Sequence, residues 1–171
     1  MSYIHQKIID QVFEIAVQSA NDYYELIYNM EANSSDIKNW LPIFCEFLTV
    51  YIVLVSRYFS HFNIDEQELE NLGSYIFTHS FLALFPKMPE FELEEFASSY
   101  MIESNTTKQF HYSPYKEIYP NPETHNYNTV MGQFSDRMIK ITSKPNPVYW
   151  FTSRELATKK FLELLKKYKK D

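Results

Sequence analysis

Apolar residues recur every three or four positions along several long stretches of this chain. In residues 3–31 one such row consists of Ile4, Ile8, Val12, Ile15, Ala16, Ser19, Tyr23, Leu26, Ile27 and Met30. This spacing matches the period of an α-helix and predicts one long amphipathic helix. Residues 31–36 favour turns and helix caps, so we expect the helix to end there.

The most apolar stretch runs from Trp40 to Phe62 and contains a single carboxylate, Glu46. A membrane span needs about 20 apolar residues, and a carboxylate near its middle costs about 2.5–3.5 kcal/mol. The run is slightly short and is interrupted by Glu46. We therefore predict the central helix of a bundle, about 40–62, rather than a membrane span. Pro42 suits the first turn of such a helix.

Two more helices are expected before residue 105. The first begins at the capping sequence NIDE, residues 63–66, and continues to about Phe85. Gly73 lies inside it, where a glycine costs about 1 kcal/mol and can mark a close helix crossing or a kink. The second is predicted over residues 90–104, after two prolines that end the preceding helix.

Residues 105–128 show no long period and are rich in proline, tyrosine and polar side chains. We predict an irregular connection with one short helical turn after Ser113. A loop of this length is uncommon and is more often functional or mobile than a plain connector. Two helices follow, one over 128–142 and a last one that starts at a capping box, TSRE, at 152–155.

These elements predict an all-α fold, a bundle of five to six helices, in a chain of 171 residues. That length is typical of one domain, which we expect to span 1–171. Hydrophobic residues make up 45% of the chain, enough to bury a core, and only 2 residues are glycine. All-β folds and glycine-rich nucleotide-binding folds require more glycine for their turns and phosphate loops.

Charge divides the chain into acidic helices (1–104), the irregular segment (105–128) and basic C-terminal helices (129–171). Residues 1–105 carry 16 acidic and 4 basic side chains, a net charge of −12, whereas residues 106–171 carry 6 and 12, a net charge of +6. Such a division can serve a charged partner, or the two halves can pack together and neutralise each other. The overall pI is about 5.4, whereas a nucleic-acid-binding protein typically has a basic pI and a basic surface patch.

The single cysteine, Cys45, excludes an internal disulfide and falls on the apolar stripe, as a core thiol does. The first ten residues lack the apolar run of a secretory leader, so we expect a cytoplasmic protein. The chain contains no P-loop, dinucleotide fingerprint, Ser-His-Asp arrangement or zinc motif, and no Glu precedes a His by three residues. We expect no cofactor and no metal.

Two ionisable residues within apolar patterns are pocket candidates, Glu46 and His79. A buried acid such as Glu46 can be a general base with a raised pKa, or a metal ligand. Alternatively, Glu46 lies at the helix rim, or pairs with a tyrosine hydroxyl or with a lysine from the basic half. His79 is interpreted as a satisfied core histidine, with a ligand or proton-relay role as the alternative. Arg57 and His61 lie one helical turn apart and are interpreted as a solvated helix end.

The irregular segment is the preferred binding candidate. Its tyrosines and histidines combine rigid apolar area with polar tips, which protein interfaces favour. The candidate residues are His111, Tyr112, Tyr115, Tyr119, His125 and Tyr127. Alternatively, the tyrosines fold back over the bundle as a lid. The lysine-rich end, KKFLELLKKYKK, can meet an acidic surface, although lysines also suit a helix C-terminus.

Three function classes follow. The first is a small cytosolic interaction protein, such as an adaptor, inhibitor or immunity-type partner, without catalysis of its own. Its partner is another protein, and a homodimer remains open. The second is a small-ligand-binding or enzymatic domain with a pocket around Glu46 and His79. The third binds nucleic acid or a membrane surface through the last helix, and the acidic composition disfavours it.

Overall fold

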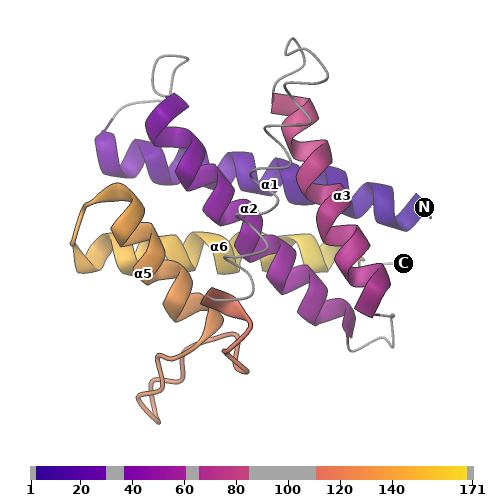
Figure 1. Cartoon of the computed structure of the whole chain (residues 1–171). Helices are drawn as coiled ribbons and strands as arrows, with labels where there is room; N and C mark the ends of the chain where they lie inside the picture. Colours follow the sequence, from indigo (N-terminus) through magenta and orange to yellow (C-terminus); the bar gives the residue numbers. More distant parts are fainter. Residues whose placement is uncertain (1–2, 30–36, 61–65, 85–110, 169–171) are drawn as a thin grey trace.

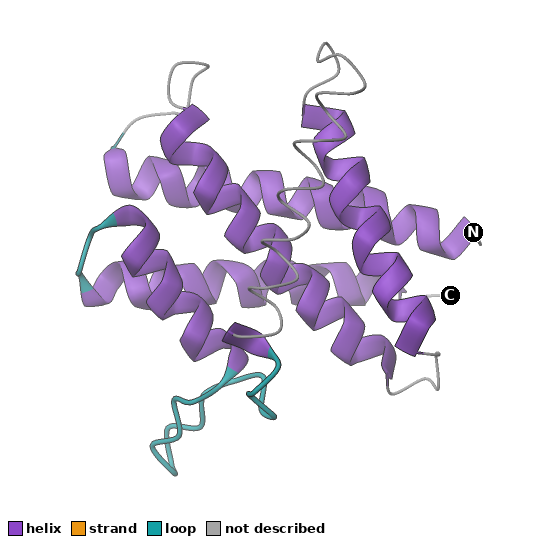
Figure 2. Cartoon of the chain, in the orientation of Figure 1, coloured by secondary structure: helices purple, strands orange, loops and turns teal. Residues whose placement is uncertain are grey.

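The computed structural model describes residues 3–29, 37–60, 66–84 and 111–168 (Figure 1). These residues form five helices and no strand (Figure 2). The helices are α1 (Tyr3–Tyr28), α2 (Ile37–Ser60), α3 (Glu66–Leu84), α5 (Val130–Thr142) and α6 (Pro147–Tyr168). The predicted all-α fold is confirmed. The helix predicted over 90–104 lies outside the described residues, as do His61 and residues 105–110.

Helix α2 is the centre of the bundle and contacts α1, α3, α5 and α6. In Figure 1 it runs diagonally across α1 and α6, with α3 on one side and α5 on the other. Most of its side chains are buried, and those with no exposed surface are Ile43, Phe44, Phe47, Leu48, Val50, Tyr51 and Leu54. The predicted central apolar helix is therefore confirmed.

The segment Asn39–Tyr58 of α2 is long and apolar enough to cross a membrane, judged by length and composition alone. Within the protein 78% of its most apolar window is buried, mainly by neighbouring helices, as is typical of a core helix. Helix α2 begins at Ile37, earlier than the sequence pattern indicates. Pro42 consequently lies inside the helix rather than in its first turn. At this interior position proline has no backbone N–H to donate, so the helix lacks one hydrogen bond.

Small residues let the helices approach closely. Ala16, Ser19 and Ala20 of α1 are fully buried, and the Ser19 hydroxyl lies 2.7 Å from the Tyr51 hydroxyl of α2. A Cβ added at Gly73 of α3 would lie 3.1 Å from Cγ2 of Ile52 in α2. Gly73 therefore marks a close helix crossing, the first of the two interpretations of that residue.

Helices α5 and α6 begin at well-defined caps. The Thr129 side chain accepts a hydrogen bond from the backbone N–H of Gly132 at 3.1 Å and caps α5. Helix α6 begins at Pro147, and the Asn146 side chain accepts from the N–H of Val148 at 2.9 Å. The predicted start at the capping box, 152–155, is wrong, because an asparagine cap followed by proline begins the helix upstream.

Candidate functional site

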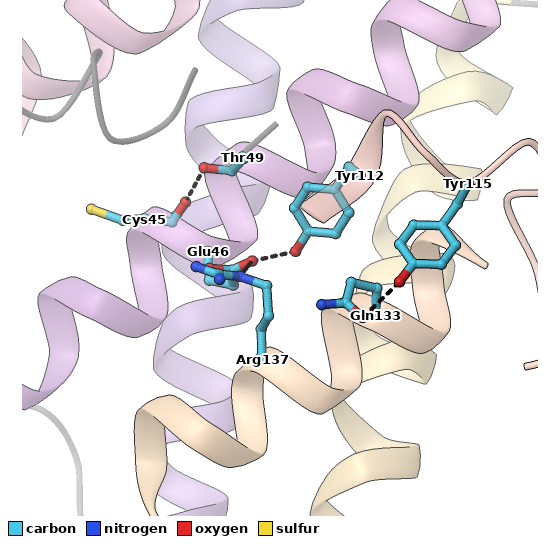
Figure 3. A network of polar contacts seen from close by, with 7 residues as sticks. All are labelled: Cys45, Glu46, Thr49, Tyr112, Tyr115, Gln133 and Arg137. Atoms are coloured by element: carbon cyan, nitrogen blue, oxygen red, sulfur yellow. Dashed lines mark hydrogen bonds and ion pairs between the residues drawn. The ribbon is translucent and has the colours of Figure 1, made fainter. Parts of the chain in front are cut away.

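Glu46 lies inside the bundle at the meeting point of three elements. Its carboxylate is 4% exposed and accepts a hydrogen bond from the Tyr112 hydroxyl, which comes from the segment before α5. Nε of Arg137, on α5, lies 2.8 Å from the same carboxylate oxygen (Figure 3). Of the alternatives for Glu46, the structure has the paired one: a tyrosine hydroxyl donates to the carboxylate, and an arginine takes the place of the lysine.

In this cluster the buried negative charge of Glu46 is paired with the positive charge of Arg137 and with the Tyr112 hydroxyl. A carboxylate removed from water is stabilised when a cation and a hydroxyl both donate to it. Tyr112 is completely buried, and its pKa is raised well above the ordinary value, first by burial and then by the negative charge of Glu46. The phenol therefore stays protonated and remains a donor at neutral pH.

A second residue of α2 holds the same segment. The Arg57 guanidinium donates to the backbone carbonyl of Tyr112 at 3.0 Å and to that of Lys116 at 3.1 Å. Burial lowers the pKa of Arg57 from its usual value. The interpretation of Arg57 as a solvated helix end is wrong, because the chain returns to this end of α2 from more than fifty residues away.

Residues 112–118, the strap, are also fixed on the α5 side. The Tyr115 hydroxyl donates to the Gln133 side chain at 3.1 Å (Figure 3). The carbonyl of Ile118 accepts from the N–H of Met131 at 2.9 Å. The strap is thus bound to α2 and to α5, and it fixes where the following turn lies.

Residues 119–127, the tyrosine turn, form a closed loop beyond the strap. Asn121 and Asn126 exchange backbone hydrogen bonds of 3.0 and 3.1 Å, and His125 adopts the left-handed conformation with φ 51°. The turn leaves Tyr119 40% exposed and Tyr127 46% exposed. Both aromatic side chains are therefore available at the surface.

A cavity of about 760 Å³ lies between the tyrosine turn and α6, and we call it the groove. One wall consists of Tyr119, Pro120, Pro122 and Tyr127. The α6 wall consists of Phe151, Arg154, Glu155, Thr158, Lys159, Leu162, Glu163 and Lys166. Phe151 and Leu162 are among the exposed large apolar side chains. The groove therefore combines exposed apolar side chains with charged side chains of both signs.

Aromatic contacts order one end of the groove. Tyr127 and Trp150 meet edge to face with ring centroids 6.3 Å apart, and Trp150 meets Phe151 at 5.0 Å. The Arg154 guanidinium lies 4.9 Å from the Trp150 ring and 5.1 Å from the Phe151 ring. Cation–π contacts of this kind restrict the arginine, so its charged group is held at a defined position.

The candidate residues of the irregular segment separate into two groups. Tyr119 and Tyr127 line the groove. Tyr112 is wholly buried and Tyr115 is partly buried against α5, as in the alternative that the tyrosines fold back over the bundle. His111 lies near the Glu46 cluster, where burial and then the positive charge of Arg137 lower its pKa.

The two pocket candidates do not form one site. His79, on α3, lies 3.1 Å from the carboxylate of Asp10 on α1, whereas Glu46 faces α5 and the strap. The His79 side chain is 41% exposed, so its interpretation as a core histidine is wrong. Within the described ranges, no group of three or more His, Cys, Asp or Glu side chains could hold a metal ion.

Sequence reasoning missed Arg137 and the first half of the α6 wall of the groove, residues 151–158, whereas the lysine-rich end that it named supplies the second half of that wall. The outer face of α6 did carry a signal, because Phe151 and Leu162 fall outside the inward row formed by Ala157, Phe161 and Leu164. Exposed apolar residues on a charged helix face often belong to a contact surface.

Comparison with known proteins finds no matching protein family, no similar curated protein and no similar solved structure.

Proposed function

We propose that this chain is an interaction protein, without catalysis of its own, that binds a partner protein in the groove between the tyrosine turn and α6. The observation that carries the proposal is the groove itself, about 760 Å³ in volume. It joins the exposed Tyr119 and Tyr127 to the exposed Phe151 and Leu162. Tyrosine and other aromatic residues are enriched at protein interfaces, where they provide large contact area at small entropic cost.

The construction of the walls supports binding of a partner without large rearrangement. Arg57 and Glu46 of α2 hold the strap through the Tyr112 carbonyl and hydroxyl, and Gln133 of α5 holds it through the Tyr115 hydroxyl. Helix α6 packs against α1, α2 and α5. A preformed surface loses less conformational freedom on binding than a mobile one, so more of the contact energy remains as affinity.

The alternative of a ligand pocket around Glu46 and His79 has less support. Glu46 already accepts hydrogen bonds from Arg137 and Tyr112, and His79 lies elsewhere, between α3 and α1, beside Asp10. Buried and paired carboxylates of this kind are common structural elements as well as catalytic ones. The groove, in contrast, is open to solvent and carries apolar side chains that are about half exposed.

Site-specific photo-crosslinking in the native host tests the proposal. A photoreactive phenylalanine analogue replaces Tyr119 in one strain and Tyr75 in a control strain, because Tyr75 is an exposed tyrosine on α3, away from the groove. We expect a discrete protein adduct from position 119 and none from position 75. The adduct protein is then purified and titrated against the wild type and the Tyr119→Ala/Tyr127→Ala and Tyr75→Ala variants.

The expected result is weaker binding by the groove double variant only, with an unchanged thermal midpoint. Truncation of two interface aromatics reduces affinity by about 10-fold or more. Equal binding by all three proteins would exclude the groove as the contact surface. Absence of any adduct at position 119, in cells that express the crosslinkable protein, would contradict the proposal as a whole.

A further inference from the structure

The groove carries more positive than negative side chains in a protein whose net charge is −6. Its α6 wall contributes the cations Arg154, Lys159 and Lys166 and the carboxylates Glu155 and Glu163. Along the whole of α6 there are five cations and two carboxylates. This helix is therefore a locally positive surface on an acidic protein, and it favours an acidic partner.

The three groove cations are available for a partner. In the part of the chain that the structure describes, no carboxylate lies within ion-pairing distance of Arg154, Lys159 or Lys166. Arg154 is held over Trp150 and Phe151, and a planar guanidinium in a fixed position can donate two parallel hydrogen bonds to one carboxylate.

We propose that the groove binds a peptide segment of a partner protein that carries spaced carboxylates with apolar side chains between them. The inference rests on the proposed function, because it takes the groove as the contact surface. The carboxylates pair with Arg154 at one end and with Lys166 at the other. The apolar side chains contact Tyr119, Tyr127 and Leu162.

The spacing of the two end cations sets the length of the segment. Arg154 and Lys166 are twelve residues apart, which is about 18 Å along a helix that rises about 1.5 Å per residue. An extended peptide rises about 3.3 Å per residue, so about six residues separate the two carboxylates. A helical partner segment needs about the same twelve residues as α6 itself.

The pattern of charges favours a peptide over a phosphate polymer. Glu155 and Glu163 lie one turn before and one turn after Lys159, so cations and carboxylates alternate along the wall. A nucleic acid presents one phosphate per nucleotide and would meet both carboxylates. A peptide can place its acids only opposite the cations, and it can leave neutral side chains opposite Glu155 and Glu163.

Selection from a library of random peptides, displayed against the purified full-length chain, tests the inference. We expect recovered sequences with two Asp or Glu residues at the stated spacing and aliphatic or aromatic residues between them. Their affinity should fall about 10-fold or more for the Arg154→Glu/Lys166→Glu variant. It should be unchanged for Lys140→Glu/Lys144→Glu, which has the same net charge but alters lysines outside the groove.

The decisive experiment exchanges the charges of the peptide and the groove. A recovered peptide whose two acids are replaced by lysine should regain affinity for Arg154→Glu/Lys166→Glu and lose it for the wild type. If that variant unfolds, Lys166→Glu together with a peptide in which one acid is replaced by lysine tests one of the two pairings without altering the stacked arginine. Circular dichroism establishes that each variant is folded.

Other outcomes overturn the inference in distinguishable ways. Neutral or basic peptides that lose affinity for Tyr119→Ala/Tyr127→Ala would refute the acidic chemistry and leave the proposed function standing. Recovery of no peptide, or of peptides insensitive to both groove variants, would contradict the groove as a protein-binding surface. Tighter binding of single-stranded oligothymidine, or of vesicles containing phosphatidylserine, with loss on Arg154→Glu/Lys166→Glu, would assign the surface to nucleic acid or membrane. Self-association abolished by the same variant would assign it to a second copy of this chain.

Discussion

Replacement of Arg137 by leucine leaves the Glu46 carboxylate inside the bundle without its cation. Glu46 is 4% exposed and the Arg137 side chain is 20% exposed, so both charges are largely removed from water. Breaking a buried pair by removing one partner costs about 3–5 kcal/mol. Because Arg137 retains some solvent contact, we expect the lower end of that range, about 3 kcal/mol of unfolding free energy.

The matched variants separate the uncompensated charge from lost packing. Lys140→Leu changes an exposed cation on the same helix and should shift stability by less than about 0.5 kcal/mol. Tyr112→Phe removes a hydrogen bond to a charged group and should cost about 1.5–3 kcal/mol. The double variant Glu46→Leu/Arg137→Leu removes both charges, so it should be much more stable than Arg137→Leu alone.

Urea unfolding followed by circular dichroism measures these values, and thermal unfolding provides a second estimate. For a chain of this size about 1 kcal/mol corresponds to about 2–4 °C, so Arg137→Leu should lower the thermal midpoint by about 6–12 °C. A loss below about 1 kcal/mol would show that water reaches Glu46 in solution. If the double variant loses as much stability as Glu46→Leu and Arg137→Leu lose in sum, the ion pair is refuted as the source of the effect.

Three further predictions concern the buried tyrosines and the two glycines. Burial raises the pKa of Tyr51 and of Tyr112, whereas unfolded tyrosines ionise near pH 10.0. Their contribution to stability is therefore complete below that pH and is lost as pH rises above it, and ultraviolet absorbance should show tyrosinate appearing together with unfolding. A Cβ at Gly132 would clash with the backbone oxygen of Tyr127, so Gly132→Ala should cost about 1–3 kcal/mol. Gly73→Ala meets only a side chain, at 3.1 Å, and should be better tolerated in the same urea titration.

Local patterns predicted the helices because each helix depends mainly on its own residues. The run around Glu46 is apolar on nearly every face, and only a central position in a bundle buries all of those faces. The predicted start of α6 was wrong because it rested on a short local pattern alone. A four-residue capping pattern such as 152–155 occurs by chance, and Asn146 followed by Pro147 provides the stronger start.

The partners of Glu46 and the position of the groove depend on contacts between distant segments. Arg137 follows Glu46 by 91 residues, and no periodic feature of the sequence links the two. The tyrosines of the irregular segment share the same composition cue, yet Tyr112 is buried whereas Tyr119 and Tyr127 are exposed. Only the packing of the strap on α2 and α5 distinguishes them.

The core network and the groove are joined through the strap. Tyr112 binds Glu46 at one end of the strap, and Ile118 hydrogen-bonds to α5 at the other, immediately before Tyr119 enters the groove wall. An ion pair between buried groups provides little net stability compared with apolar packing, but its geometry is demanding. The physical role that best fits Glu46 is therefore positional, because it binds the strap through Tyr112 and α5 through Arg137, and the strap fixes the tyrosine wall opposite α6.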